Sequence, residues 1–373
     1  MGNKIRVLII DDSSMVRHAI TEALSMDAEI EVVGVANDPL IAIDKIPKLL
    51  PDVLTLDMEM PRMDGLSFLR KLKAEKSTIP VIVISSLTQQ GSAMALKAME
   101  AGACEVLAKP DGNTSFGALA AKMAFYVKAA YRSRRREYPQ AAQLSKNASF
   151  PSASSDKGAS TSSITHNVNK IVSNIQRSTS YQDKRLIMIG SSTGGVEALR
   201  YLLPQLPDSM PPIVVVQHIP AFFSKAVADR LNELCSYEVR EAVDNEPLLA
   251  GQCLIAPGNY HLAVVNRNGY RTRLTQSPPI HHCRPAVDVL FRSGAEAAGR
   301  QALAVLLTGM GTDGAVGMQY VRDTGGRTLA EHEDSCVVYG MPRAAMELGV
   351  VEKAVMLSDM PKAIMEMVNC LPH

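Results

Sequence analysis

The chain has 373 residues, of which 46% are hydrophobic, and its charges nearly balance at a formal net charge of +1. This length predicts two or three domains, and the charge balance gives no general attraction to nucleic acid or to a membrane. The N-terminus is unlike a signal peptide, no apolar stretch could span a bilayer, and six scattered cysteines form no C-x-x-C pair, so we expect a cytoplasmic protein without zinc or disulfides.

The first third of the chain alternates short, β-branched apolar runs with helix-like stretches. Such alternation predicts βαβ units and an N-terminal α/β domain with a doubly wound parallel sheet. The runs cover residues 5–10, 53–56, 81–84 and 106–108. Ligands of such sheets bind beyond the carboxyl ends of the strands. We therefore expect the polar residues that follow the runs to meet in one crevice: Asp12, Asp57, Ser85 and Lys109.

This crevice has the charge of a site for a metal ion and a phosphoryl group. Asp11, Asp12 and Asp57 would bring three carboxylates together, which favours a bound cation because like charges so close cannot all stay ionised. Oxygen ligands in an open site suit Mg2+. Lys109 and Ser85 could stabilise a phosphoryl group on one carboxylate. Each residue taken alone also fits a simple turn or loop.

Residues 4–125 resemble the receiver domain of bacterial two-component response regulators. The resemblance rests on Asp11-Asp12, on the stretch around Asp57 up to Pro61, on Asp64-Gly65, on Ser85-Ser86 and on Lys109-Pro110. It implies that Asp57 is the phosphoacceptor and that Asp12, with Asp11, binds Mg2+. It also implies a metal contact from the Glu59 carbonyl and phosphoryl contacts from Ser85 and Lys109. Val106 stands where many receivers carry a switching aromatic residue.

The segment 132–183 differs from both flanks in composition. It begins with clustered arginines and continues with Ser, Thr, Asn, Ala and Gln and few large apolar residues. Such a segment buries too little apolar surface to offset its ordering entropy, so we predict a flexible linker. The arginines could contact an acidic partner, although a solvated basic end of the preceding helix is the simpler interpretation.

A second α/β domain, with a mixed and mostly parallel sheet, is predicted for residues 184–373. The expected strands cover 186–189, 213–216, 254–256, 262–265 and 303–307, and the expected helices 196–203, 224–234 and 287–298. The recognition helix of a DNA-binding domain is absent from this pattern.

A Gly-Ser loop at residues 190–195 lies between a predicted strand and a predicted helix. Gly190-x-Ser192-x-Gly194 has the spacing of a nucleophile elbow, in which glycines allow a tight turn and helix N–H groups stabilise an oxyanion. The same loop could instead hold a phosphate. His218 follows the strand at 213–216 and is the best base, with His261, His281, His282 and His332 as rivals. Asp313, after the strand at 303–307, could orient the imidazole.

Residues 184–373 resemble the catalytic domain of the chemotaxis protein-glutamate methylesterase/glutamine deamidase family. The matching stretches are 190–195, 217–220, 256–258, 284–291, 308–314 and 335–342. The resemblance implies that Ser192 is the nucleophile, His218 the general base and Asp313 its partner, with the backbone near Thr193 and Met310 as oxyanion-hole candidates. Cys283 stands where relatives often have a histidine before Arg-Pro.

The two resemblances together imply a phosphorylation-activated hydrolase in chemotaxis. Its substrates would be glutamate methyl esters and glutamines on the cytoplasmic helices of chemoreceptors, a histidine kinase would phosphorylate Asp57, and the esterase site would need no cofactor. The order receiver, linker, enzyme suggests that the unmodified receiver covers the Ser192 cleft. Neither nucleic-acid binding nor membrane insertion is expected.

Two other interpretations remain open from the sequence. Gly309-x-Gly311-x-x-Gly314 follows a strand, with acidic residues Glu331, Glu333 and Asp334 about twenty positions on, as in NAD(P)-binding proteins. The charge of Asp313 inside that loop and the late position of the loop in the domain argue against a pyrophosphate site. In the other interpretation, Ser192 merely lines the pocket of a non-catalytic, receiver-linked binding module.

Overall fold

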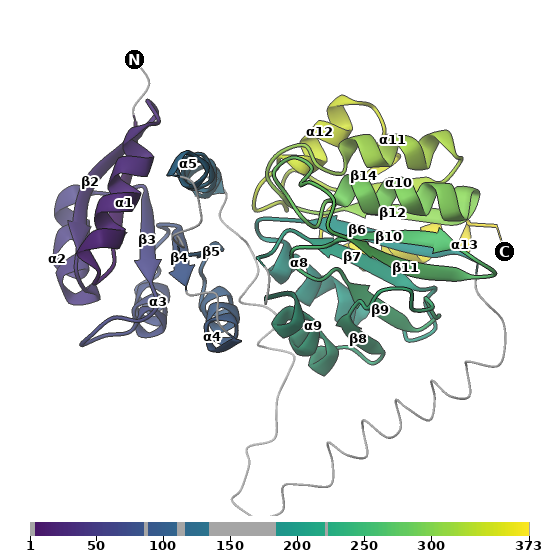
Figure 1. Cartoon of the computed structure of the whole chain (residues 1–373), viewed down its shortest axis with the longest axis horizontal. Coiled ribbons are helices and arrows are strands. Elements are labelled where there is room, and N and C mark those ends of the chain that lie inside the picture. The colour runs from purple at the N-terminus through teal and green to yellow at the C-terminus, as the bar shows by residue number, and fades with distance from the viewer. Residues whose placement is uncertain (1–3, 86–88, 110–115, 134–183, 221–222, 373) are drawn as a thin grey trace, which may run out of the picture.

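The structure is a computed structural model that describes residues 4–85, 89–109, 116–133, 184–220 and 223–372. Figure 1 shows an α/β unit formed by the first part of the chain and a larger α/β unit formed by the last part. The linker predicted at 132–183 lies outside the described residues from residue 134 onward. No helix in the described ranges is long and apolar enough to cross a membrane.

The N-terminal unit has a parallel sheet of five strands in the order β2-β1-β3-β4-β5. This doubly wound arrangement is the one predicted from the alternating apolar runs. Its elements are β1 (Ile5–Ile10), α1 (Ser14–Ser25), β2 (Ile30–Ala36), α2 (Pro39–Leu49), β3 (Val53–Asp57), α3 (Gly65–Ala74), β4 (Val81–Ser85), α4 (Gln89–Glu100), β5 (Glu105–Ala108) and α5 (Phe116–Ser133).

Helices cover both faces of this sheet, which explains why its strands are apolar without alternation. Buried side chains of α1 and α5, such as Leu24 and Val127, pack on one face. Buried side chains of α2, α3 and α4, such as Phe68, pack on the other. Asp57 and Ser85 therefore emerge at the carboxyl edge of a sheet that is dry on both sides.

The C-terminal unit has a sheet of seven strands in the order β14-β13-β12-β6-β7-β9-β8 and a two-stranded hairpin, β10-β11. Its strands are β6 (Leu186–Ser191), β7 (Ile213–Gln217), β8 (Glu238–Glu241), β9 (Gln252–Ile255), β10 (His261–Asn266), β11 (Tyr270–Thr275), β12 (Ala302–Leu306), β13 (Arg327–Glu331) and β14 (Lys353–Val355). Its helices are α8 (Gly195–Leu202), α9 (Phe223–Leu234), α10 (Val287–Ala298), α11 (Ala315–Asp323), α12 (Met341–Glu347) and α13 (Met360–Asn369), with short 3-10 turns at Leu203–Gln205 and Gly299–Gln301.

The seven-stranded sheet is parallel throughout its pairings, so the expected mostly parallel sheet is confirmed, whereas the expectation that the sheet is mixed is wrong. The antiparallel pairing belongs to the separate hairpin, whose first strand is the run predicted at 262–265. The hairpin is amphipathic, and buried residues such as Leu262 and Val264 pack into the core under α10 and α11. Helices α8, α9 and α13 cover the opposite face.

The two units are in direct contact. Helix α4 of the first unit packs along α9 of the second, with Arg230 Nε 2.9 Å from Glu100 Oε1. Phe223 is buried in a cluster formed mainly by residues of the first unit, and Leu96 and Met99 lie against the core of the second. The contact therefore combines an apolar centre with an ion pair.

Candidate active site

The loop after β6 holds Ser192 in a tight, buried turn. Ser192 is 6% exposed; its N–H donates to the carbonyl of Thr308 (3.0 Å) and its carbonyl accepts from the N–H of Gly195 (2.7 Å). Gly194 has a φ of +79°, which favours glycine, and a Cβ there would collide with the side chain of Val337. The turn predicted from the Gly-Ser spacing is present.

Gln217, the last residue of β7, ties this loop to the following histidine. Its Nε2 donates to the carbonyls of Ser192 (2.8 Å) and His218 (3.0 Å), and its Oε1 accepts from Ser191 Oγ (2.6 Å). A Cβ on Gly195 would overlap Gln217 Oε1, so the loop needs glycine there. Sequence reasoning assigned no role to Gln217, although a polar residue that ends an apolar strand was an available signal.

His218 and Asp313 form a close buried pair beyond the ends of β7 and β12, which lie on either side of β6. His218 Nε2 lies 2.7 Å from Asp313 Oδ2, and the strands concerned, β12, β6 and β7, are adjacent in the sheet. Burial alone would raise the pKa of Asp313, but the hydrogen bond with His218 holds it below its ordinary value. Burial alone would lower the pKa of His218, but Asp313 and Cys283 raise it above its ordinary value. Because Nε2 faces a carboxylate, Nδ1 is the nitrogen left to act as a base.

The nucleophile–base contact of a triad is not formed in this structure. No hydrogen bond joins Ser192 Oγ to His218, both of which are described, and the thiol of Cys283 lies 3.6 Å from Nδ1. Catalytic hydrogen bonds are often long before substrate binds, so this geometry leaves Ser192 a candidate. The sequence predicted that the serine, the imidazole and the carboxylate would converge. In the structure His218 and Asp313 are in direct contact. The Ser192 loop is linked to His218 through Gln217.

The thiol of Cys283 gives a direct test of which imidazole nitrogen is used. Cys283 is partly exposed, so an alkylating reagent such as iodoacetamide can reach it. Alkylation would place a new group against Nδ1, and we expect it to lower hydrolysis by at least about tenfold, since small misplacements in active sites have such effects. The Cys283→Ala variant should keep its own rate after the same treatment. Cys370→Ala, which removes an exposed cysteine, is the control and should remain sensitive. Equal inactivation of Cys283→Ala and wild type would contradict the assignment.

Backbone N–H groups of Thr193 and Met310 remain available for an oxyanion. Within the described ranges neither N–H is hydrogen-bonded to an acceptor. The two segments are held together because Thr308 Oγ1 donates to the Thr193 carbonyl (3.0 Å). A Cβ on Gly309 would lie 2.8 Å from Ser192 Cβ, so the second segment also passes close to the serine.

The rival histidines lie in other environments. His261 is fully buried, and its two ring nitrogens contact the N–H of Ala286 (3.2 Å) and the carbonyl of Pro278 (3.1 Å). The remaining rivals are at the surface or paired there with an aspartate: His281, His282 and His332. None of the rivals has the direct contact with a buried aspartate that His218 has.

The dinucleotide-binding interpretation finds no support at this loop. The N–H groups of Gly314 and Gly317, at the start of α11, donate to Asp288 Oδ1 and so are not open to a pyrophosphate. Glu331 is fully buried, with its carboxylate on the N–H of Thr308 (2.8 Å). Asp313 points toward His218, and its charge stands where a pyrophosphate would have to bind.

In the N-terminal unit, the predicted crevice is assembled around Asp57. Lys109 Nζ lies 2.7 Å from Asp57 Oδ2, and Asp57 Oδ1 accepts from the N–H of Met58 (2.7 Å). Burial raises the pKa of Asp57 even though Lys109 lowers it. Ser85 is buried at the end of the adjacent strand, and its carbonyl accepts from the Lys109 N–H (2.8 Å). Glu59 is exposed two positions after Asp57.

The acidic residues of this crevice fit a hard divalent cation. Ligand oxygens of Asp11, Asp12 and Asp57 lie within 4.8 Å of one another. Asp11 Oδ2 is buried and has no hydrogen-bond partner, and burial together with the charge of Asp57 raises the pKa of Asp11 to about 6. A cation would satisfy that oxygen and offset the repulsion between the carboxylates.

The receiver-like unit lies against the Ser192 loop. Glu105 Oε2, at the start of β5, accepts a buried hydrogen bond of 2.9 Å from Thr193 Oγ1. On the neighbouring loop, a Cβ on Gly311 would lie 4.0 Å from the ring of Phe125. Sequence reasoning anticipated that this unit would cover the cleft but named neither Glu105 nor Phe125, because such contacts depend on how two separate folds dock.

In the C-terminal domain, a serine, an imidazole and a carboxylate follow three adjacent strands, as expected of a serine hydrolase. The attached N-terminal unit has an acidic crevice suited to a metal ion and a phosphoryl group. Together the two units define the class of regulated serine hydrolases. Residues 187–364 match the family described as CheB methylesterase, and residues 7–118 match the response regulator receiver domain. The chain belongs to the family of receiver-linked protein-glutamate methylesterases/protein-glutamine glutaminases.

Relatives with these names match along their whole length. A protein-glutamate methylesterase/protein-glutamine glutaminase of Syntrophus aciditrophicus is 44% identical, covering 98% of this chain and 100% of the relative. Its counterpart in Syntrophotalea carbinolica is 42% identical, covering 99% of each chain. The crystal structure of the Thermotoga maritima CheB methylesterase catalytic domain is 40% identical, with a TM-score of 0.49, covering 49% of this chain and 98% of that one.

Proposed function

We propose that this protein hydrolyses glutamate methyl esters and deamidates glutamines on chemoreceptors, and that phosphorylation of Asp57 activates it for adaptation in chemotaxis. The observation that carries the proposal is the buried His218–Asp313 pair beside the Ser192 loop, in a chain whose full-length relatives carry those activities in their names. We assign the catalytic domain to residues 184–373 and the receiver to residues 4–125, with a linker at 132–183 between them.

In the proposed acylation step, Ser192 Oγ attacks the side-chain carbonyl carbon of the ester. His218 Nδ1 takes the serine proton and gives it to the departing methoxy oxygen, so methanol leaves and an acyl-enzyme remains. Asp313 stabilises the imidazolium formed in between. The N–H groups of Thr193 and Met310 would stabilise the negative oxygen of the tetrahedral intermediate.

Deacylation repeats these steps with water as the nucleophile and releases the glutamate side chain. With a glutamine substrate the first step expels ammonia instead of methanol, so the same residues account for both reactions. None of these steps requires a cofactor. A substrate on the cytoplasmic helices of receptors places the enzyme in the cytoplasm, and we expect neither nucleic-acid binding nor membrane insertion.

In the receiver, Asp57 would accept phosphate from a histidine kinase. Mg2+, held by Asp11, Asp12, Asp57 and the Glu59 carbonyl, would supply positive charge that stabilises the phosphoryl oxygens. Lys109 Nζ, now on Asp57 Oδ2, and Ser85 Oγ would contact the phosphoryl group. Phosphorylation therefore replaces the Lys109–Asp57 contact at the end of β5, the strand that carries Glu105.

The Glu105–Thr193 hydrogen bond supports regulation by occlusion. This bond engages the hydroxyl of Thr193, whose backbone is an oxyanion-hole candidate. It also holds the buried Glu105 carboxylate next to the site where negative charge must develop during the reaction. Phosphorylation would shift a pre-existing equilibrium toward the undocked state. Deletion of residues 1–140 should likewise raise the basal rate.

The function is tested by release of methanol from a methylated chemoreceptor and of ammonia from its glutamine form. Wild type should release both, faster when a small phosphodonor such as acetyl phosphate is added with Mg2+. Asp57→Asn should keep the basal rate and lose the response to the donor. A wild-type protein that releases neither product, with or without the donor, would refute the proposal.

Weakening the docked interface should activate the enzyme without phosphate. We expect Glu105→Ala to raise the basal rate by roughly 10- to 100-fold, because a hydrogen bond to a charged group contributes about 1.5–3 kcal/mol to the docked state. Glu75→Ala, which removes an exposed carboxylate of the same unit, is the matched control and should leave the rate unchanged. An unaltered basal rate in Glu105→Ala would mean that this contact does not hold the receiver in place.

A further inference from the structure

The carboxylate of Asp313 does more than face His218. Its Oδ2 also accepts from the N–H of Val287 (2.7 Å), and its Oδ1 accepts from the N–H of Asp288 (2.9 Å). These are the first N–H groups of α10, whose own N-cap residue is Ala286 and offers no side-chain acceptor. Asp313 therefore caps α10 from a different loop.

Asp288 in turn caps the start of α11. Its Oδ1 accepts from the N–H groups of Gly314 (2.9 Å) and Gly317 (2.6 Å) at the start of α11, where the N-cap residue Gly314 has no side chain. The helices approach closely, since a Cβ on Gly317 would lie 2.7 Å from Phe291 Cβ and 3.0 Å from Asp288 Cα. Each helix is thus capped by an aspartate that the other segment supplies.

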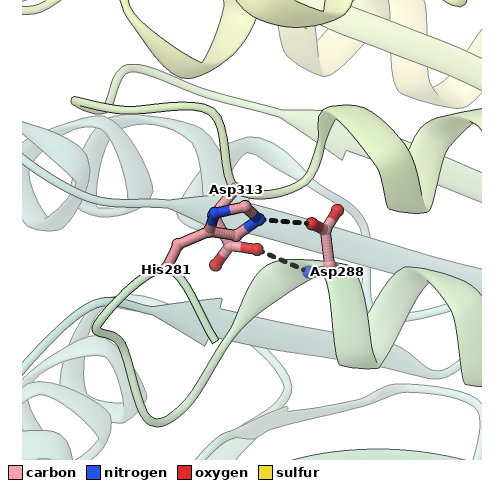
Figure 2. Close-up of side chains that lie close together, drawn as sticks. All are labelled: His281, Asp288 and Asp313. Atoms are coloured by element: carbon pink, nitrogen blue, oxygen red, sulfur yellow. Dashed lines mark hydrogen bonds and ion pairs between the residues drawn. The ribbon is translucent and has the colours of Figure 1, made fainter. Parts of the chain in front are cut away.

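The exposed side chain of His281 contacts the other oxygen of Asp288. Its Nε2 lies 3.1 Å from Asp288 Oδ2, and Figure 2 shows the three side chains gathered at the start of α10. His281, Asp288 and Asp313 also have a spacing that could hold a metal ion. Each of the four carboxylate oxygens, however, already has a nitrogen partner, so a cation would have to break capping bonds. The arrangement is that of a hydrogen-bonded clamp.

We propose that Asp288 is a positioning residue for the esterase reaction, which holds the start of α11 so that the Asp313 carboxylate stays in contact with His218. The inference rests on the proposed function. Asp313 immediately precedes Gly314, one of the two N–H donors that Asp288 binds, so losing this cap would free the chain at the residue next to the catalytic carboxylate. Displacements of about 1 Å in an active site can lower rates by on the order of 100-fold.

The clamp is tested by comparing Asp288→Ala with Asp288→Asn. Alanine removes the acceptor, so we expect kcat to fall by roughly 10- to 100-fold with KM nearly unchanged. Asparagine keeps one acceptor oxygen for Gly314 and Gly317 and should restore kcat to within about threefold of wild type. If asparagine is as harmful as alanine, capping by Asp288 is not the cause. If the alanine variant fails to fold, Asp288→Asn still tests the capping alone, because a fall in kcat well beyond threefold in that variant would contradict it.

The pH profile separates positioning from a general loss of structure. The titratable groups that face His218 are Asp313 and Cys283, and contact with Asp313 raises the pKa of the imidazole. Loosening that contact lowers this pKa, so the acid limb of kcat/KM should move to lower pH in Asp288→Ala. An acid limb that stays at the wild-type pH, with a normal kcat, would overturn the inference.

A double-mutant cycle completes the experiment. If Asp288 acts through Asp313, adding Asp288→Ala to Asp313→Asn should lower kcat by less than about threefold further. A full additional loss would mean that Asp288 acts by another route. Wild-type methanol release, measured in the same series, keeps the two proposals separate. Its absence refutes the proposed function, whereas an active wild type with an unaffected Asp288→Ala refutes only the clamp.

Discussion

Replacing Ser192 with alanine is expected to lower kcat for methanol release by on the order of 10⁶-fold, the loss typical when a serine nucleophile is removed. The hydroxyl forms the covalent bond to the substrate, and the other hydroxyl between β6 and α8 in the described residues, that of Thr193, donates to Glu105. KM should change little, because the backbone groups that would bind the substrate are retained. Steady-state assays on a methylated receptor measure both quantities.

Ser191 provides a matched control one residue away. It is fully buried, and its Oγ donates to Gln217 Oε1 at 2.6 Å, so it cannot reach a substrate. Ser191→Ala leaves Gln217 Oε1 without its donor, which costs about 1–3 kcal/mol of stability but keeps the nucleophile. An alkylphosphonate should therefore label wild type and Ser191→Ala, but not Ser192→Ala. Equal labelling of all three proteins would refute the assignment of Ser192 and favour a non-catalytic binding module.

The sequence was most informative about strands that are buried on both faces. The apolar runs of β1, β3, β6, β7 and β12 predicted parallel strands because helices cover both sides of each sheet. Their ends could be located to within a residue or two. The strands β2, β8, β11, β13 and β14 were not predicted. The edge strands β8 and β14 are short and only partly buried, so they lack the continuous apolar run of a central strand.

The same logic explains which site residues could be named in advance. Ser192, His218 and Asp313 each follow an apolar run, and the rule that parallel strands end at one edge brings them together; their catalytic roles stay predictions. Contacts that join residues far apart in the chain had no such signal. Cys283 Sγ lies against a histidine 65 positions away, and Thr193 bonds to a glutamate 88 positions away.

Asp288 illustrates the same limit within one domain. It lies in the stretch 284–291 that resembles the family, yet nothing in its local pattern distinguishes it from an ordinary acidic residue in the first turn of a helix. Its partners, Gly314 and Gly317, lie 26 and 29 positions further on. The Asp288 carboxylate can cap α11 and hold the adjoining Asp313 loop only because α10 packs closely against α11.

Asp313→Asn should have the second largest effect, a fall in kcat of on the order of 10⁴-fold, because an amide in place of the carboxylate favours the wrong histidine tautomer. In wild type the carboxylate at 2.7 Å requires the proton on Nε2 and leaves Nδ1 basic. An asparagine NH2 facing Nε2 would instead place the proton on Nδ1, where it blocks transfer from Ser192. The oxyanion-hole candidates are unaffected, so residual hydrolysis should persist.

The pH dependence of this variant has a definite sign. Contact with Asp313 raises the pKa of His218, so its loss lowers that pKa and moves the acid limb of kcat/KM to lower pH. Asp323→Asn, on the exposed end of α11, is the control and should alter neither rate nor profile. If Asp313→Asn kept the wild-type rate, His218 would not depend on this carboxylate. A large loss with an unshifted acid limb would mean that contact with Asp313 does not set the pKa that the acid limb reports.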